Sequence, residues 1–249
     1  MFKKKKIYLC LLNQGDIKVD LAKILNYIQQ NDSYEIIVSY PSAKPITNNR
    51  NMIVQKFLAI KDADYLMMID ADIIPTPDIL NLVDFEKDII TPLMFVQQKG
   101  TLIPLYLRRN ADGIYDAGNY LEETGLQEVD ATGTGCIVIK REVLEKVEHP
   151  FENVYDRDGV KKLGNDFNFC KKAKKLGFKV WVHLDYIADH ISEMSLREVF
   201  LDKIKQYHND KELHQLKQVL KEQGQLDQVL EEVNKLKNKN ENSRYDKPI

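Results

Sequence analysis

The stretch that decides the fold is Tyr65-Leu66-Met67-Met68-Ile69-Asp70-Ala71-Asp72. Its run of apolar residues predicts a buried strand, and the strand ends in two carboxylates separated by one residue. In an extended chain, residues i and i+2 point to the same side, so Asp70 and Asp72 would converge where the strand leaves the sheet. A divalent cation with oxygen ligands suits such a pair, and a merely polar strand end is the alternative interpretation.

The residues around this stretch favour the metal interpretation. Thr76 and Pro77 predict the N-cap and first turn of a short helix over 79–83, so the carboxylates precede that helix and are not its expected caps. A second pair, Asp62-Ala63-Asp64, comes before the apolar strand. Ligand sites in parallel sheets lie at the carboxyl ends of strands, so we interpret this second pair as loop or cap residues.

The composition bounds the class of protein. The 249 residues suffice for one large domain, or for one domain with an appendage. Hydrophobic residues make up 43% of the chain and charged residues 30%, which is typical of soluble globular proteins. The net charge is -2 and no basic stripe alternates with aromatic residues, which argues against nucleic acid as the main partner.

Two further patterns concern the cellular compartment. The basic cluster Lys3-Lys4-Lys5-Lys6 precedes an apolar run over 7–12 that is too short for a signal peptide or a membrane span. The cysteines, Cys10, Cys136 and Cys170, form no Cys-x-x-Cys pair and lie within apolar or helical patterns. They are typical of small buried residues in a reducing compartment. We therefore expect a cytoplasmic protein without structural zinc.

Strands and helices alternate along most of the chain. Short apolar runs predict strands, and helical spacing predicts helices. Their order is strand 7–12, helix 19–30, strand 34–39, helix 52–60 with its start around 48–51, strand 65–69, a strand end at 88–92, strand 136–139, helix 141–147, helix 165–176 and strand 179–182. Such alternation favours parallel βαβ units. Residues 103–121 alternate and turn, which predicts antiparallel hairpins.

The composition changes after His190. Residues 196–239 carry no strand signal and are rich in Lys, Glu and Gln, and their apolar residues recur at intervals of three and four positions. We assign 193–249 to a C-terminal extension. This pattern predicts an α-helical tail of two helices interrupted near Gly224, with a frayed end. Packing against the rest of the chain is the usual role of such helices. Self-association through them, which would give a homo-oligomer, is the alternative.

Four motifs in a fixed order carry a resemblance to a known family: Asp70-Ala71-Asp72, Gly133-Thr134-Gly135-Cys136, Asn165-Asp166 and Asp189-His190. This order resembles the GT-A nucleotide-sugar glycosyltransferases, in particular the family-2-like group, over residues 5–192. The resemblance implies a Rossmann-like α/β catalytic domain over 1–192, with a mixed, mainly parallel sheet flanked by helices. It also implies a hexosyltransferase that moves a sugar from a UDP- or GDP-linked donor to a hydroxyl of a glycan, protein or small molecule.

The resemblance further implies a metal site. In that family the Asp-x-Asp motif binds Mn²⁺ or Mg²⁺, which bridges the two phosphates of the donor. Carried over, Asp72 is the direct ligand, and Asp70 contacts the ribose or reaches the metal through water. His190 corresponds to a third protein ligand, with His183 as the second candidate. A core or surface histidine is the alternative interpretation of His190.

The remaining site residues are also implied by the resemblance. Asp166 corresponds to the acid that takes the proton of the acceptor hydroxyl in inverting members, while a helix N-cap is its alternative role. Asn165 departs from the family, which often has Glu there. The nucleotide would contact Leu12, Asn13, Gln14, Tyr40, Arg50, Asp70 and Ala71. The pocket for the sugar and the acceptor would comprise Thr132, Gly133, Thr134, Gly135 and Asn165.

Two other functions compete with this hypothesis. A sugar-phosphate nucleotidyltransferase needs a glycine-rich, basic loop after the first strand, whereas Asn13-Gln14-Gly15-Asp16 offers one glycine and no cation. A non-catalytic protein that binds nucleotide sugars, or that assembles through its helical tail, would not need Asp72 and His190 together. Metal-dependent binding of a nucleotide would distinguish the enzyme from this last class.

Overall fold

The computed structural model describes residues 3–98, 101–110, 112–192, 196–222 and 224–225. Contacts within the chain divide it into two compact units, Met1–Ser192 and Glu193–Ile249. None of the helices in the described ranges is long and apolar enough to span a membrane.

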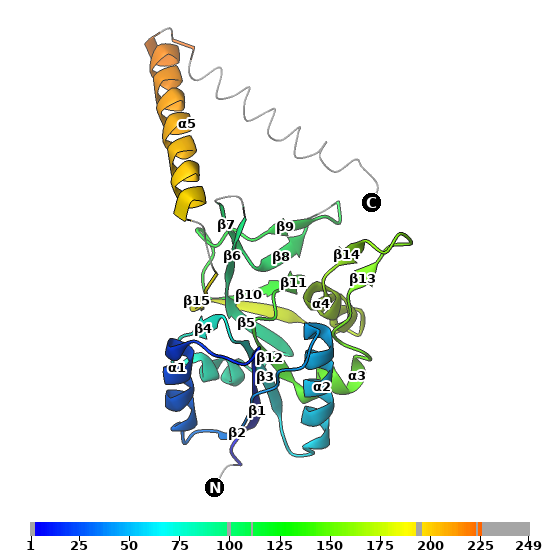
Figure 1. Ribbon diagram of the computed structural model, residues 1–249. Helices are drawn as coiled ribbons and strands as arrows, with labels where there is room; N and C mark the ends of the chain where they lie inside the picture. The colour runs from blue at the N-terminus through cyan, green and yellow to red at the C-terminus, as the bar shows by residue number, and fades with distance from the viewer. Residues whose placement is uncertain (1–2, 99–100, 111, 193–195, 223, 226–249) are drawn as a thin grey trace. The chain divides into compact units, whose positions relative to one another are not determined.

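The first unit is built on an eight-stranded sheet (Figure 1). Seven strands follow one another across it in the order β10 (Leu126–Val129), β15 (Val180–His190), β5 (Ile89–Leu93), β12 (Cys136–Lys140), β3 (Tyr65–Asp70), β1 (Lys6–Leu12) and β2 (Glu35–Ser39), and β4 (Ile73–Pro75) pairs with β15. β1 is parallel to β2 and β3, and β15 is parallel to β5. β12 and β10 run antiparallel to their neighbours. The expected mixed, mainly parallel α/β fold is confirmed.

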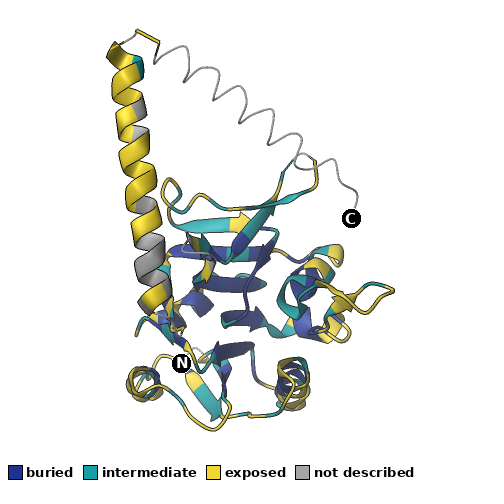
Figure 2. Ribbon diagram, turned by 45° about the horizontal axis from the view of Figure 1, so that its top comes forward, coloured by how far each residue is buried: buried dark blue, intermediate teal, exposed yellow. Residues whose placement is uncertain are grey.

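Helices cover both faces of this sheet (Figure 2). Alternate residues of β1 divide between two cores, because successive side chains of a strand point to opposite faces. Ile7, Leu9 and Leu11 pack with α1 (Val19–Gln29) and the 3₁₀ helix η1 (Ile79–Phe85). Residues of the opposite face pack with three helices, α2 (Ile46–Ala59), α3 (Arg141–Lys146) and α4 (Asn165–Lys175).

Smaller antiparallel sheets lie beside the main one. β8 (Tyr106–Arg109) pairs with β9 (Tyr115–Ala117) and β11 (Ala131–Thr132), which confirms the hairpins predicted for this region. The other two hairpins are β6 (Phe95–Gln98) with β7 (Thr101–Pro104), and β13 (Val154–Tyr155) with β14 (Lys161–Leu163).

Two helix starts differ from the predictions. α2 begins at Ile46, before the expected start around 48–51, and its polar first turns place Asn49 and Arg50 in buried positions. The short helix η1 begins at Ile79 after Asp78, so Thr76 is not its N-cap. Thr76 instead contributes its carbonyl oxygen, which accepts a hydrogen bond from the backbone N–H of Ile79.

The second unit contains helix α5 (Leu196–Glu222), and its described residues form no strand. Gly224 follows with a φ of 66°, a left-handed conformation that suits glycine at the end of a helix. This agrees with the predicted interruption near Gly224. The second predicted helix and the frayed end fall within 226–249, outside the described residues.

Candidate functional site

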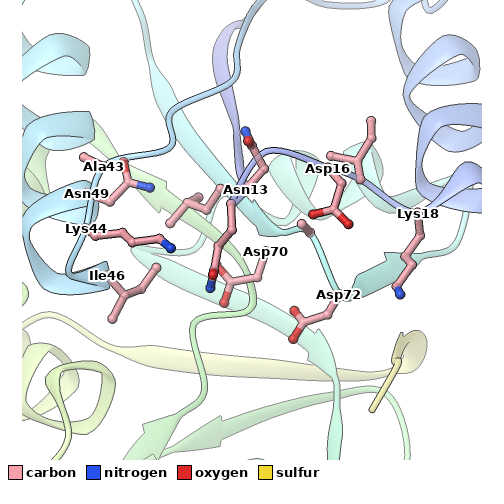
Figure 3. Close-up of a pocket in the computed structure, with 13 residues that line it drawn as sticks. Asn13, Asp16, Lys18, Ala43, Lys44, Ile46, Asn49, Asp70 and Asp72 are labelled. Atoms are coloured by element: carbon pink, nitrogen blue, oxygen red, sulfur yellow. The ribbon is translucent and has the colours of Figure 1, made fainter. Parts of the chain in front are cut away.

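A cavity of about 360 Å³ opens at the carboxyl ends of β1 and β3 (Figure 3). Parallel strands end at the same edge of a sheet, and the loops that leave this edge supply the lining. Six of the residues singled out from the sequence line it: Leu12, Asn13, Gln14, Asp70, Ala71 and Asp72. The second pair, Asp62 and Asp64, lies at the other end of β3, where both accept hydrogen bonds from Lys6.

Backbone hydrogen bonds hold the end of β3 in place. The N–H of Asp70 donates to Gly135 at 2.7 Å, and the N–H of Ala71 donates to Leu12 at 2.9 Å. The strand ends at Asp70, and the chain turns through Ala71 and Asp72 before β4. The alternation of a strand therefore does not extend to Asp72, and the two carboxylates have different partners.

Asp70 is paired with Arg50, which is 6% exposed. Nη2 of Arg50 donates to Oδ2 of Asp70 at 2.9 Å, and Nη1 donates to Oδ1 of Asn165 at 2.8 Å. The guanidinium carbon also lies 5.9 Å from the ring centre of Phe151. Arg50 thus connects the end of β3 to the first residue of α4.

The carboxyl group of Asp70 has an unusual environment. Burial raises the pKa of Asp70 to about 6, and the negative charge of Asp72 adds to this shift. The positive charge of Arg50 opposes it. Oδ1 of Asp70 is buried and accepts no hydrogen bond from the described residues. An acceptor without a donor in a buried position is costly, and a bound water, ion or ligand would satisfy it.

Asp72 is paired with His190. Their Oδ2 and Nε2 atoms are 3.5 Å apart. The pairing of β4 with β15 brings them together, because His190 lies opposite Ile73 and the N–H of Ile191 donates to the carbonyl of Asp72 at 2.8 Å. Nδ1 of His190 lies 3.0 Å from the carbonyl oxygen of Phe95, which can only accept, so Nδ1 carries a proton. In the neutral ring, Nε2 then presents its lone pair toward Asp72.

His183, the second histidine considered, lies elsewhere on β15. Its ring packs 4.5 Å from Phe85 and 4.8 Å from Tyr186, measured between ring centres. Its burial lowers its pKa, and the nearby Asp185 opposes this shift. The structure therefore places His190, and not His183, beside the carboxylates of the cavity.

The side chains at this edge of the sheet include possible ligands for a divalent metal. Within the described ranges, no group of three or more His, Cys, Asp or Glu side chains is close enough to hold one. Mg²⁺-type sites in phosphate-binding enzymes, however, use one or two carboxylates and complete their shell with substrate phosphates and water. The oxygen of Asp72 and the Nε2 lone pair of His190 fit such a partial site, and Mn²⁺ accepts both donor types.

Asp166 lies in the first turn of α4, and Gly164 is the residue that precedes the helix. The interpretation of Asp166 as the N-cap is therefore wrong by two positions. Its Oδ1 accepts a hydrogen bond from the N–H of Phe167 at 2.9 Å. Asn165 accepts a hydrogen bond from Arg50, which also donates to Asp70, so Arg50 links the start of α4 to the end of β3.

The segment from Thr132 to Gly135 is tightly packed. The hydroxyl of Thr132 is fully buried and donates to the carbonyl of Leu105 at 3.0 Å. Thr134 is also buried, and its Oγ1 has no partner among the described residues. A Cβ at Gly133 would lie 3.1 Å from Leu105, and one at Gly135 would lie 3.0 Å from Ile73. A side chain at either position would therefore require Leu105 or Ile73 to shift by a few tenths of an ångström.

Seven residues of the lining were not among the candidate site residues of the sequence: Asp16, Ile17, Lys18, Ala43, Lys44, Ile46 and Asn49. They follow β1 and β2, at the same edge as Asp70, so the rule that located Asp70 could have found them. Lys44 points into the cavity opposite Asp16 and Lys18 (Figure 3). Tyr40, in contrast, is 53% exposed and does not belong to the lining.

Comparisons with known proteins bear on the fold. No family model and no curated protein matches the chain. The solved structure of A197 from STIV matches with a TM-score of 0.53 and 19% identity, over 76% of this chain and 86% of that one. The structure of GalNAc-T7 with UDP, GalNAc and Mn²⁺ matches with a TM-score of 0.46 and 14% identity, over 77% of this chain and 44% of that one.

The inositol-1-phosphate CTP transferase from T. maritima matches with a TM-score of 0.40 and 11% identity, over 80% of this chain and 95% of that one. Likenesses at these identities concern the fold alone, and the two with TM-scores below 0.5 carry no argument. The likeness to A197 from STIV supports the expected fold class, and an activity has to be argued from the site itself.

Proposed function

We propose that this protein is a metal-dependent glycosyltransferase that moves a sugar from a nucleoside diphosphate to an acceptor hydroxyl. The observation that carries the proposal is the pairing of Asp72 with His190, 3.5 Å apart, at the carboxyl edge of a parallel sheet and beside a cavity. A carboxylate oxygen and an imidazole nitrogen lone pair at this position suit a divalent cation that also binds phosphate.

In this proposal the cavity binds the donor. Leu12 and Ala71 provide an apolar floor, and Lys18 and Lys44 provide cations for the diphosphate. Asp72 and His190 would hold Mn²⁺ or Mg²⁺, which supplies positive charge to the leaving nucleoside diphosphate when it is bound. Arg50 would contact the nucleotide and also position the site. Its terminal nitrogens donate to Asp70 and Asn165, and its buried Nε has no partner among the described residues.

The acceptor side involves the start of α4. For an inverting reaction, the carboxylate of Asp166 accepts the proton of the attacking hydroxyl. Arg50 fixes the orientation of this helix start relative to β3 through Asn165 and Asp70. A base held on a helix by buried hydrogen bonds keeps its distance to a bound donor, which is what general-base catalysis requires.

Calorimetric titration tests this function. UDP and GDP are titrated into the full chain with Mn²⁺ and, separately, with EDTA, and a panel of nucleotide sugars is scored for slow hydrolysis. We expect binding only with metal, and hydrolysis of one donor. Asp72→Ala should abolish both, whereas the matched variant Asp62→Ala, from the pair at the other end of β3, should retain both.

Other outcomes would decide against the proposal. The metal-dependent transferase would be excluded if UDP and GDP bind equally well with Mn²⁺ and with EDTA. It would also be excluded if the Asp72→Ala variant is as active as Asp62→Ala. Release of pyrophosphate from a nucleoside triphosphate and a sugar phosphate would instead identify a nucleotidyltransferase. Binding with neither hydrolysis nor transfer across the panel would indicate a non-catalytic protein.

A further inference from the structure

A second cavity, of about 240 Å³, lies between the hairpin of β8 and β9 and the second half of α4. Its lining consists of Arg109, Tyr115, Asp130, Lys171, Lys174 and Lys175. None of these residues lines the cavity at the carboxyl edge of the sheet. The proposed function makes no use of them.

The lining of this second cavity is strongly positive. Four cationic side chains and one carboxylate surround it, although the whole chain has a net charge of -2. Asp130 is already engaged, because Lys174 forms an ion pair with its Oδ1 and the N–H of Arg109 donates to its Oδ2 at 2.6 Å. These contacts outweigh the effect of burial and lower the pKa of Asp130.

Three charges remain without a counterion. Within the described part of the chain, Arg109, Lys171 and Lys175 form no ion pair. Like charges gathered around one small cavity repel each other, and the field they create attracts anions to it. A bound anion with several oxygen atoms would relieve this repulsion and accept hydrogen bonds from each of them.

The lysines alone have a simpler explanation. Lys174 and Lys175 belong to the last turn of α4, where cations interact favourably with the helix dipole. That explanation does not extend to Arg109, which comes from the end of β8. Its guanidinium carbon lies 4.9 Å from the ring centre of Tyr115, its cross-strand neighbour. Stacking on an aromatic ring orients the planar guanidinium and leaves its edge free to bind an oxyanion.

We propose that this cavity is a binding site for a phosphate group, held by Arg109, Lys171 and Lys175. The planar fork of an arginine beside two ammonium groups is the combination that phosphate oxygens prefer. The volume lies below that of most sites for drug-sized ligands, so the cavity suits free phosphate or a small phosphate ester rather than a whole nucleotide. The site is independent of the proposed transferase activity.

NMR titration of the full ¹⁵N-labelled chain tests the proposal. Inorganic phosphate is added in the presence of EDTA and at low ionic strength, and glucose 6-phosphate is added in a parallel series. We expect saturable shifts at Arg109, Tyr115 and the end of α4, with Asn13 and Asp72 unaffected. Tighter binding of the ester would identify an organic phosphate as the ligand, and equal binding would identify phosphate itself.

Variants make the test specific. Arg109→Gln with Lys175→Gln should weaken phosphate binding at least about tenfold, because it removes two charge-assisted contacts. Lys56→Gln is the matched control, since Lys56 is an exposed lysine in the last turn of α2, and it should bind as the wild type does. Equal weakening by both variants, or the absence of saturable shifts at Arg109, would overturn the proposal.

Discussion

Arg50 donates a hydrogen bond to Asp70 at 2.9 Å and, from its other terminal nitrogen, a second one to Asn165 at 2.8 Å. These two contacts join the end of the central strand β3 to the start of α4, across 115 residues of sequence between Arg50 and Asn165. One buried side chain therefore joins Asp70 to Asn165, the neighbour of the candidate base Asp166.

Removal of Arg50 should lower the stability of the protein. Arg50→Ala leaves the buried carboxyl of Asp70 and the amide of Asn165 without their donor, which typically costs about 3 kcal/mol. Urea unfolding at pH 7 measures the change in the free energy of unfolding. The exposed Arg157 is the control, and Arg157→Ala should change stability by less than about 0.5 kcal/mol. Equal losses in the two variants would show that the Arg50 contacts contribute little.

Asp166 should control turnover more than donor binding. If it accepts the proton of the acceptor hydroxyl, Asp166→Asn lowers kcat by about 10²–10⁴-fold and leaves the KM for the donor nearly unchanged. Steady-state kinetics with the donor found in the hydrolysis panel measure both constants. Asp158→Asn, at an exposed position of the β13–β14 turn, should match the wild type. A rise in donor KM with unchanged kcat would make Asp166 a binding residue.

His183 should make stability depend on pH. Its burial between Phe85 and Tyr186 lowers its pKa below the ordinary value of 6.5, against the opposing charge of Asp185. Between the two values the unfolded chain binds more protons than the folded one, so stability is full above pH 6.5 and declines as the pH falls through the lower pKa.

Urea unfolding at pH 7, 6 and 5 measures this dependence. We expect His183→Gln to lose less stability than the wild type between pH 7 and 5, because the glutamine does not titrate. The exposed His214 serves as the control, and His214→Gln should follow the wild type. The same slope in wild type and His183→Gln would assign the pH dependence to other groups.

Arg141 should stabilise the end of α2. Its Nε donates to the carbonyl of Ala63 at 2.6 Å, and its Nη2 donates to those of Phe57 and Ile60 at 3.1 and 2.5 Å. The last carbonyls of a helix have no partner within it, and a charged donor contributes about 1.5–3 kcal/mol at such a position.

Thermal and urea unfolding of two variants test this role. Arg141→Ala should lose about 2 kcal/mol or more. Arg141→Lys should recover only part of the loss, because a single ammonium cannot reach three separate acceptors as a planar fork does. Full recovery by lysine would mean that charge alone, and not the geometry of the fork, stabilises this helix end.

Local patterns determined much of the fold. The order of strands and helices in the first unit could be predicted because runs of apolar residues and helical spacing reflect burial within one element. The position of Asp70 at the end of β3 followed from the same run. The exact start of α2 could not be predicted, because its polar residues Asn49 and Arg50 are buried. Asn49 donates to the nearby Pro41, and Arg50 donates to Asp70 and the distant Asn165.

The sequence by itself therefore determined the class of fold and the edge of the sheet where Asp70 and Asp72 lie. Only the tertiary structure decided their partners, because β15 brings His190 to Asp72 and α2 brings Arg50 to Asp70. It also decided that Lys44 lines the first cavity and that Arg109 meets the lysines of α4 in the second. These contacts depend on how elements that are far apart in the sequence pack together. The periodicity within a single element therefore cannot predict them.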